Sequence, residues 1–198
     1  MNRLETTLID AVARLNRFGV DCALVGGLAV SARAEPRFTR DVDLAVIVID
    51  DLAAESLVRH FIEIGFRVLA TVEQETANRL ATVRLLPPGQ TAEGVVVDLL
   101  FASSGIETEI VQSAEKIEVF PDVFVRVAKV GHLIALKILA CDDDRPQDEV
   151  DLRSLLLDVS DADVTDAGEA LKLVSERGFE RGRNLAEALK SAVLRWRP

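Results

Sequence analysis

A glycine pair followed by two carboxylates in an apolar segment constrains the fold of this chain more than any other feature of its sequence. Gly26 and Gly27 follow a short apolar run and precede an apolar segment with helical character. After thirteen more residues, Asp41 and Asp43 open the segment Asp41–Ile49, which is dense in Val, Ile and Leu and is typical of a buried strand. The order strand, glycine turn, helix and strand predicts an α/β unit that brings the turn and the carboxylates together.

The two carboxylates are expected to point to the same face of their strand, because residues two apart in a strand share a face. Val42 and Leu44 then point to the opposite face. Two adjacent carboxylates repel each other unless a cation lies between them, and burying unpaired charge is costly. Carboxylate oxygens suit a hard divalent ion, so Asp41 and Asp43 predict a site for Mg²⁺ or Mn²⁺.

The glycine turn predicts a place for phosphate groups. Glycine lets the backbone approach a ligand closely, and free N–H groups at a helix N-terminus attract phosphate oxygens. Gly26 and Gly27 would then hold a triphosphate, while the Asp pair holds the metal ion that bridges it. A Gly-Gly turn or an Asp-x-Asp motif alone is more often structural, so the specificity lies in their order and close spacing.

Val25-Gly26-Gly27, thirteen residues and Asp41-Val42-Asp43-Leu44 together resemble the signature of the DNA polymerase β-type nucleotidyltransferase superfamily. The whole segment Arg37–Leu44 is similar to AbiEii-type abortive-infection toxins and to small aminoglycoside nucleotidyltransferases. The resemblance is strong over residues 24–46, moderate over 95–101 and 129–152, and slight after 160. It implies an α/β (α+β) nucleotidyltransferase fold with a mixed sheet, and transfer of an NMP from an NTP to an acceptor hydroxyl.

Further site residues follow from this resemblance. In the superfamily a third carboxylate from a neighbouring strand completes the metal site, and the candidate is Asp98, the one charge in the apolar run Val95–Phe101. Lys137 lies in an apolar helical pattern, where a lysine must extend to solvent, pair or reach into a cleft. Similarity to the AbiEii-type pattern implies that Lys137 contacts the nucleotide and that Asp148 lies near the active site.

Two of these interpretations have a structural alternative. Asp148 and Asp151, near Arg145, also fit a charge cluster at a helix start. Arg40 is expected either to steer the triphosphate or to form an ion pair within its loop. The predicted catalytic residues are Asp41, Asp43, Asp98, Lys137 and Asp148; the predicted metal ligands are Asp41, Asp43 and Asp98; the predicted nucleotide-binding residues are Gly26, Gly27, Arg40 and Lys137.

The chain has 198 residues, which suffice for a buried core and an added helical region. Strand and helix patterns predict a catalytic core over residues 1–127 and a helical C-terminal region over 128–198 that packs on it. The absence of an apolar run near ~20 residues and of a signal-peptide core predicts a cytoplasmic protein without a membrane span. Cys22 and Cys141 are single and far apart, which is consistent with a reducing compartment.

The charge of the chain indicates which kinds of acceptor it could bind. The net charge of −10 argues against broad, nonspecific binding to nucleic acid. Residues 177–198 nevertheless carry six basic and two acidic residues, so the sequence allows either a specific RNA partner or a solvated helix face.

Three functions remain open at this stage. The first is an AbiEii-like toxin that modifies RNA or protein and is neutralised by an antitoxin protein. The second is an aminoglycoside-type enzyme that modifies a small molecule. The third is a catalytically silent nucleotide-binding module that kept the fold.

Overall fold

The computed structural model describes residues 2–74, 79–91, 93–141 and 146–197. Within them, seven strands form one sheet in the order β3-β4-β5-β2-β1-β7-β6. The sheet is mixed, because β2 pairs in parallel with β5 and β1 in parallel with β7, whereas the other neighbours are antiparallel. The strands are β1 (Cys22–Val25), β2 (Asp41–Val46), β3 (Arg67–Gln74), β4 (Arg79–Leu86), β5 (Val96–Leu100), β6 (Glu115–Phe120) and β7 (Val123–Val127).

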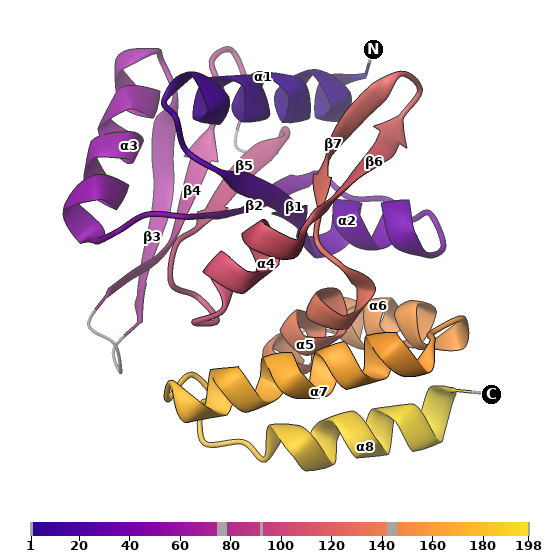
Figure 1. Cartoon of the computed structure of the whole chain (residues 1–198). Helices are drawn as coiled ribbons and strands as arrows, with labels where there is room; N and C mark the ends of the chain where they lie inside the picture. The colour runs from indigo at the N-terminus through magenta and orange to yellow at the C-terminus, as the bar shows by residue number, and fades with distance from the viewer. Residues whose placement is uncertain (1, 75–78, 92, 142–145, 198) are drawn as a thin grey trace.

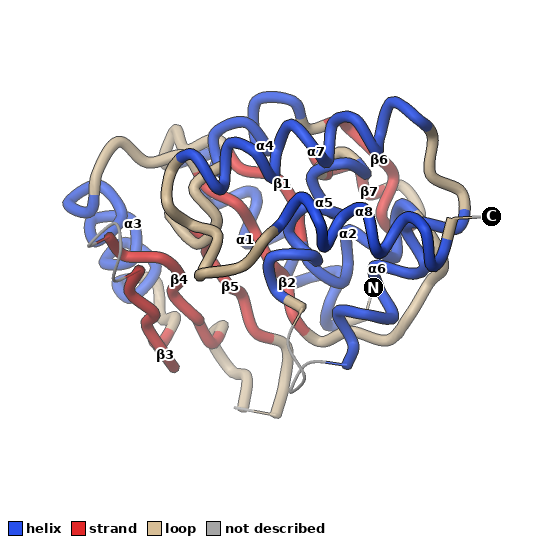
Figure 2. The backbone as a smooth tube through the Cα atoms, turned by 90° about the horizontal axis from the view of Figure 1, so that it is seen from below, coloured by secondary structure: helices blue, strands red, loops and turns tan. Residues whose placement is uncertain are grey.

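Helices lie on both sides of the sheet (Figures 1 and 2). α1 lies on one side, and the rings of Phe18, at its C-terminal end, and Phe61 on α3 are in contact. The four C-terminal helices gather on the opposite side, where α2 also contacts α5 and α6. The helices are α1 (Arg3–Arg17), α2 (Gly26–Arg33), α3 (Asp51–Glu63), α4 (Glu107–Ser113), α5 (Val130–Ala140), α6 (Pro146–Leu157), α7 (Asp161–Glu176) and α8 (Leu185–Trp196).

The predicted elements around the glycine turn are present, with two changes at their ends. α2 begins at Gly26 itself rather than after the glycine pair. The predicted strand Asp41–Ile49 is wrong at its C-terminal end, since β2 stops at Val46. The chain turns there because Asp50 caps α3 by accepting a hydrogen bond from the Ala53 N–H, and this leaves Ile49 88% exposed.

The last strand ends at Val127 and α5 begins at Val130. Contacts of α2 with α5 and α6 join the helical region to the glycine turn. Among the described residues, none of the helices is both long and apolar enough to cross a membrane.

Candidate active site

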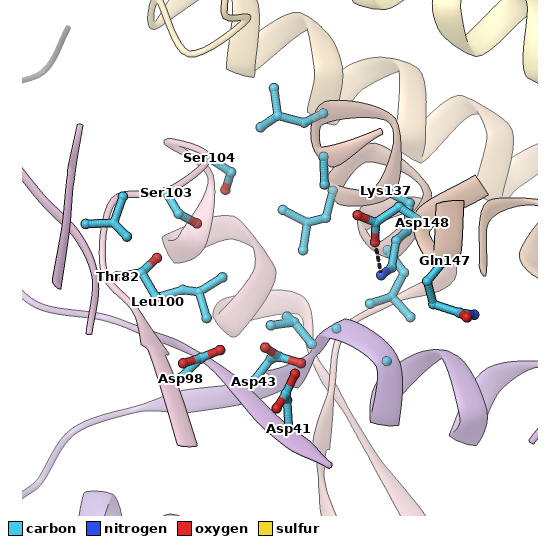
Figure 3. Close-up of a pocket in the computed structure, with 18 of the residues that line it drawn as sticks. Asp41, Asp43, Thr82, Asp98, Leu100, Ser103, Ser104, Lys137, Gln147 and Asp148 are labelled. Atoms are coloured by element: carbon cyan, nitrogen blue, oxygen red, sulfur yellow. Dashed lines mark hydrogen bonds and ion pairs between the residues drawn. The ribbon is translucent and has the colours of Figure 1, made fainter. Parts of the chain in front are cut away.

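Two neighbouring strands, β2 and β5, bring the predicted carboxylates together into one acidic row, and the next strand, β4, places Arg84 beside them. The parallel register of β2 and β5 places Asp43 opposite Asp98, and the antiparallel register of β4 and β5 places Arg84 opposite Asp98 on the other side. Asp41 lies on the same face of β2, two residues before Asp43. These side chains line a cleft of about 760 Å³, and Figure 3 shows the three carboxylates together at its base.

The walls of the cleft come from both parts of the chain. On one side, α5 and α6 contribute Leu133, Lys137 and Asp148. On the other side lie the hydroxyl groups of Thr82, Ser103 and Ser104 (Figure 3). The site therefore spans the boundary between the sheet and the helical region.

Both glycines of the turn are in close contact with charged side chains. Gly26 has φ +64°, and a Cβ added there would lie 2.0 Å from Oδ2 of Asp43. A Cβ added to Gly27 would lie 2.2 Å from Nη2 of Arg37. Val25 caps α2 without a side-chain hydrogen bond, which leaves first-turn N–H groups for an anion. The turn is thus built for close approach, with a carboxylate and a guanidinium beside it.

We predict that Gly26→Ala displaces Asp43 and lowers catalytic activity by about 10²-fold, the effect expected of a catalytic group moved by about 1 Å. The matched control is Gly19→Ala, because Gly19 has a similar φ of +68° but nothing within 4 Å of an added Cβ. Both variants should lose about 1–2 kcal/mol of stability from the left-handed backbone. Only Gly26→Ala should also lose activity, measured at equal concentrations of folded protein. Equal activities of the two variants would contradict the assigned contact.

Asp43 lies in a strongly negative environment. Burial raises its pKa to about 7, with further contributions from Asp98 and Asp41, and the nearby cations Lys137 and Arg84 only partly oppose this. Its surroundings therefore disfavour the ionised carboxylate, because burial and the neighbouring acids outweigh the two cations. The pair Asp41 and Asp43 therefore fits a divalent cation by both its oxygen ligands and its unbalanced charge.

Asp98 has a protein cation as its partner. Its Oδ1 accepts from Nε of Arg84 at 2.9 Å, and its Oδ2 accepts from Nη2 at 2.6 Å. The same Nη2 lies 3.8 Å from Oδ2 of Asp41. In the part of the chain that the structure describes, no group of three His, Cys, Asp or Glu residues could hold a metal ion. Asp98 thus lies at the site as predicted, and both of its carboxylate oxygens accept hydrogen bonds from Arg84.

Lys137 is held by two carboxylates. Its Nζ lies 2.6 Å from Oδ1 of Asp148 and 2.7 Å from Oδ2 of Asp151, and all three side chains are buried. Arg37 forms a two-point contact with Asp151, at 2.5 and 2.7 Å. Burial raises the pKa of Asp151, but the hydrogen bonds from Arg37 and Lys137 outweigh it and lower that pKa below its usual range. These pairs join α5, α6 and the loop before β2.

The predicted residues are brought together with one exception. Lys137 and Asp148 line the cleft with Gly26, Gly27 and the acidic row, whereas Arg40 is not among the lining residues and its Nη1 donates to the carbonyl of Glu93. Asp148 and Asp151 are buried and both pair with Lys137. Arg145, expected beside them, lies outside the described residues.

Sequence reasoning missed Arg37 and Arg84. Arg37 stood in the quoted segment Arg37–Leu44, but its partner is 114 positions away. The sequence signal for Arg84 was a single charge in a segment whose pattern otherwise predicts a strand. In the structure Arg84 and Thr82, two residues apart, both line the cleft. Neither signal identifies the partner.

The basic C-terminal segment is largely neutralised. Arg183 donates to carbonyls at the C-terminal end of α5, from Ile138, Leu139 and Cys141. Four further residues form the ion pairs Arg177–Glu109, Lys190–Glu187, Arg195–Glu149 and Arg197–Asp161, and Arg181 donates to the Ser103 carbonyl. Arg181 lines the cleft. Each basic side chain among the described residues of this segment therefore has a partner within the protein.

Comparisons with known proteins agree with this arrangement. Residues 8–195 match the family described as "Nucleotidyl transferase AbiEii toxin, Type IV TA system". A search of curated proteins found no match. The crystal structure of an antigenic nucleotidyltransferase-like protein from Paracoccidioides brasiliensis is similar, with 19% identity, a TM-score of 0.52, and coverage of 94% of this chain and 92% of that chain.

A second solved structure is the crystal structure of ANT(2")-Ia in complex with adenylyl-2"-tobramycin. It has 17% identity, a TM-score of 0.50, and coverage of 96% of this chain and 98% of that chain. At these identities the two solved structures show a shared fold, which is the predicted nucleotidyltransferase fold.

Proposed function

The chain belongs to the AbiEii nucleotidyl transferase family, and on that premise we propose that it transfers an NMP from an NTP to a hydroxyl group of an RNA in the cleft. Nucleotidyl transfer is the chemistry of the family; the metal, the acceptor and the toxicity belong to the proposal. The observation that supports it best is the contact between Gly26 and Asp43. It joins a turn suited to phosphates to a buried carboxylate that forms no ion pair among the described residues.

We assign the triphosphate to the glycine turn. The N–H groups of the first turn of α2 bind phosphate oxygens, and Arg37, fixed by Asp151 beside Gly27, adds a positive charge. Lys137 faces the same cleft and stabilises charge that develops on the phosphates. Asp148 orients Lys137 through its 2.6 Å contact, which supports a positioning role over that of a general base.

Asp41 and Asp43 are the proposed metal ligands, with Mg²⁺ or Mn²⁺ as the ion. When bound there, such an ion would polarise the α-phosphate and lower the pKa of the acceptor hydroxyl. Asp98 adds negative charge beside the pair and fixes Arg84 at the edge of the site.

The charge of the cleft supports RNA over an aminoglycoside. Aminoglycosides are polycations and need a site with excess negative charge. The charges of the described lining residues balance instead, since four are basic and four are acidic. The basic residues are Arg37, Arg84, Lys137 and Arg181, and the acidic residues are Asp41, Asp43, Asp98 and Asp148. The wall opposite α5 offers hydroxyl groups and Arg181, which suit a phosphate-bearing acceptor. Since the chain is acidic overall, we expect a local contact at the cleft rather than a broad nucleic-acid surface.

We further propose that this transfer inactivates its RNA target in the cytoplasm, where NTPs and RNA are present, and that an antitoxin protein counteracts it. The support is the description of the family as a type IV toxin–antitoxin component. A growth defect on expression that disappears with Asp41→Ala is the expected result.

The test of the acceptor is incubation of the purified protein with each α-³²P-labelled NTP, Mg²⁺ or Mn²⁺, and a cell extract. Label that is sensitive to RNase and resistant to protease is the expected result. Label in protein or in small molecules would contradict the RNA assignment. No label with any NTP would favour the silent module, and label that survives Asp41→Ala and Asp43→Ala would contradict the metal assignment.

A further inference from the structure

Arg84 occupies a position at the acidic row that a cation would otherwise fill. Arg84, Asp98 and Asp43 stand at one level on the adjacent strands β4, β5 and β2. The guanidinium of Arg84 therefore approaches the row from the side opposite Gly26, which contacts Asp43. Its Nη2 bridges toward Asp41 at 3.8 Å while holding Asp98 at 2.6 Å.

This ion pair is well shielded on the side of the carboxylate. The Asp98 side chain is 9% exposed, and both of its oxygens accept charge-assisted hydrogen bonds in the two-point geometry that favours arginine. Moving Arg84 away would leave a buried charge unpaired or demand another cation in its place. The Arg84 side chain is 44% exposed and lines the cleft, so its outer surface still faces a bound substrate.

The three carboxylates consequently have different roles. Asp41 and Asp43 lack a close protein cation of their own, since the nearest described ion-pair contact of either is the 3.8 Å approach of Arg84 to Asp41. Asp98 already has a full charge partner. An ion that used Asp98 as a third ligand would have to share the carboxylate with a guanidinium or expel it.

We propose that Arg84 takes the place of a second metal ion, so that one divalent ion binds at Asp41 and Asp43 while Arg84 stays on Asp98. The inference rests on the proposed function, because it assumes a metal ion at that pair. It assigns Asp98 as the residue that positions Arg84 and not as a ligand. Arg84 then supplies a fixed positive charge on the acceptor side of the site.

The number of bound ions tests this directly. Native mass spectrometry would count Mn²⁺ per chain in complexes with the α,β-methylene analogues of the four NTPs, each in turn. The wild type should carry one Mn²⁺. Arg84→Gln should carry two, because Asp98 becomes available as a ligand, and Arg84→Gln/Asp98→Asn should return to one.

Arg40→Gln is the matched control for charge. It removes a positive charge next to Asp41 but leaves Asp98 and Arg84 paired, since Arg40 donates to the Glu93 carbonyl. It should still carry one ion. Two ions in the wild type, or one in Arg84→Gln, would overturn the inference and leave the proposed function standing. No ion in any complex would overturn the metal assignment of the proposed function and this inference with it. The number of Mn²⁺ ions bound by the wild type tests the inference by itself, even if Arg84→Gln folds poorly.

Discussion

Asn in place of Asp43 is expected to give a protein that is more stable than the wild type and almost inactive. Asp43 is the most buried of the proposed metal ligands and contacts the phosphate-binding turn at Gly26. Losing this ligand weakens binding of the divalent ion, whose positive charge would stabilise negative charge that develops in the transition state, so transfer should fall by about 10³-fold. Label transfer from an α-³²P NTP measures this loss.

The gain in stability follows from the pKa of Asp43, which folding raises to about 7 because of burial and the neighbouring carboxylates. An acidic side chain whose pKa is raised by folding destabilises the folded state once it ionises. The loss of folding stability caused by ionised Asp43 is therefore absent below about pH 4 and grows as the pH rises toward 7. Above pH 7 it has its full size. The difference in melting temperature between Asp43→Asn and the wild type, measured without metal, should follow the same course.

Asp41→Asn is the comparison for this result. The Asp41 side chain is 44% exposed, so its replacement should lower transfer with a smaller gain in stability. Adding Mg²⁺ should reduce the advantage of Asp43→Asn, since only the wild type keeps both carboxylates for the ion. An Asp43→Asn protein that transfers label at the wild-type rate, or is less stable at pH 8, would contradict the assigned site.

Met in place of Lys137 is expected to destabilise the protein by about 3–5 kcal/mol. The side chains of Lys137, Asp148 and Asp151 are at most 10% exposed, and removing the lysine takes its positive charge away from two buried carboxylates, while Arg37 stays on Asp151. Breaking a buried ion pair from one side costs this much because the partner charge stays buried. Chemical denaturation with urea measures the difference.

Lys129→Met provides the matched control. The Nζ of Lys129 lies 3.8 Å from Asp166, and both side chains are about 40% exposed, so its loss should cost less than about 1 kcal/mol. If Lys137→Met costs no more than Lys129→Met, the ion-pair network does not hold α5, α6 and the Arg37 loop together as described.

The sequence predicted the parts of the site that depend on local spacing. Gly26 and Gly27 lie where a strand meets a helix, and Asp41 and Asp43 share a face of β2, because both facts follow from the geometry of one short segment. The resemblance to known nucleotidyltransferases supplied Asp98, which the parallel register then placed beside Asp43.

The partners of these residues were not predictable from spacing. The contact of Arg37 with Asp151 and that of Arg84 with Asp98 depend on how distant segments pack, and a single sequence does not carry this information. The same limit explains why Arg40, beside the carboxylates in sequence, was chosen over Arg37. Asp148 and Asp151 also fit a charge cluster at a helix start, because helix periodicity does not reveal that α6 packs against α5.

The central claim is that this cleft transfers a nucleotidyl group, and the position of the label in the NTP tests it most directly. Purified wild type and Asp43→Asn would be incubated with an RNA acceptor and with NTPs labelled on either the α- or the γ-phosphate. The account predicts that the wild type attaches the α-label and releases the γ-label as pyrophosphate, while Asp43→Asn attaches neither. Attachment of the γ-label, or equal attachment of the α-label by Asp43→Asn, would contradict it.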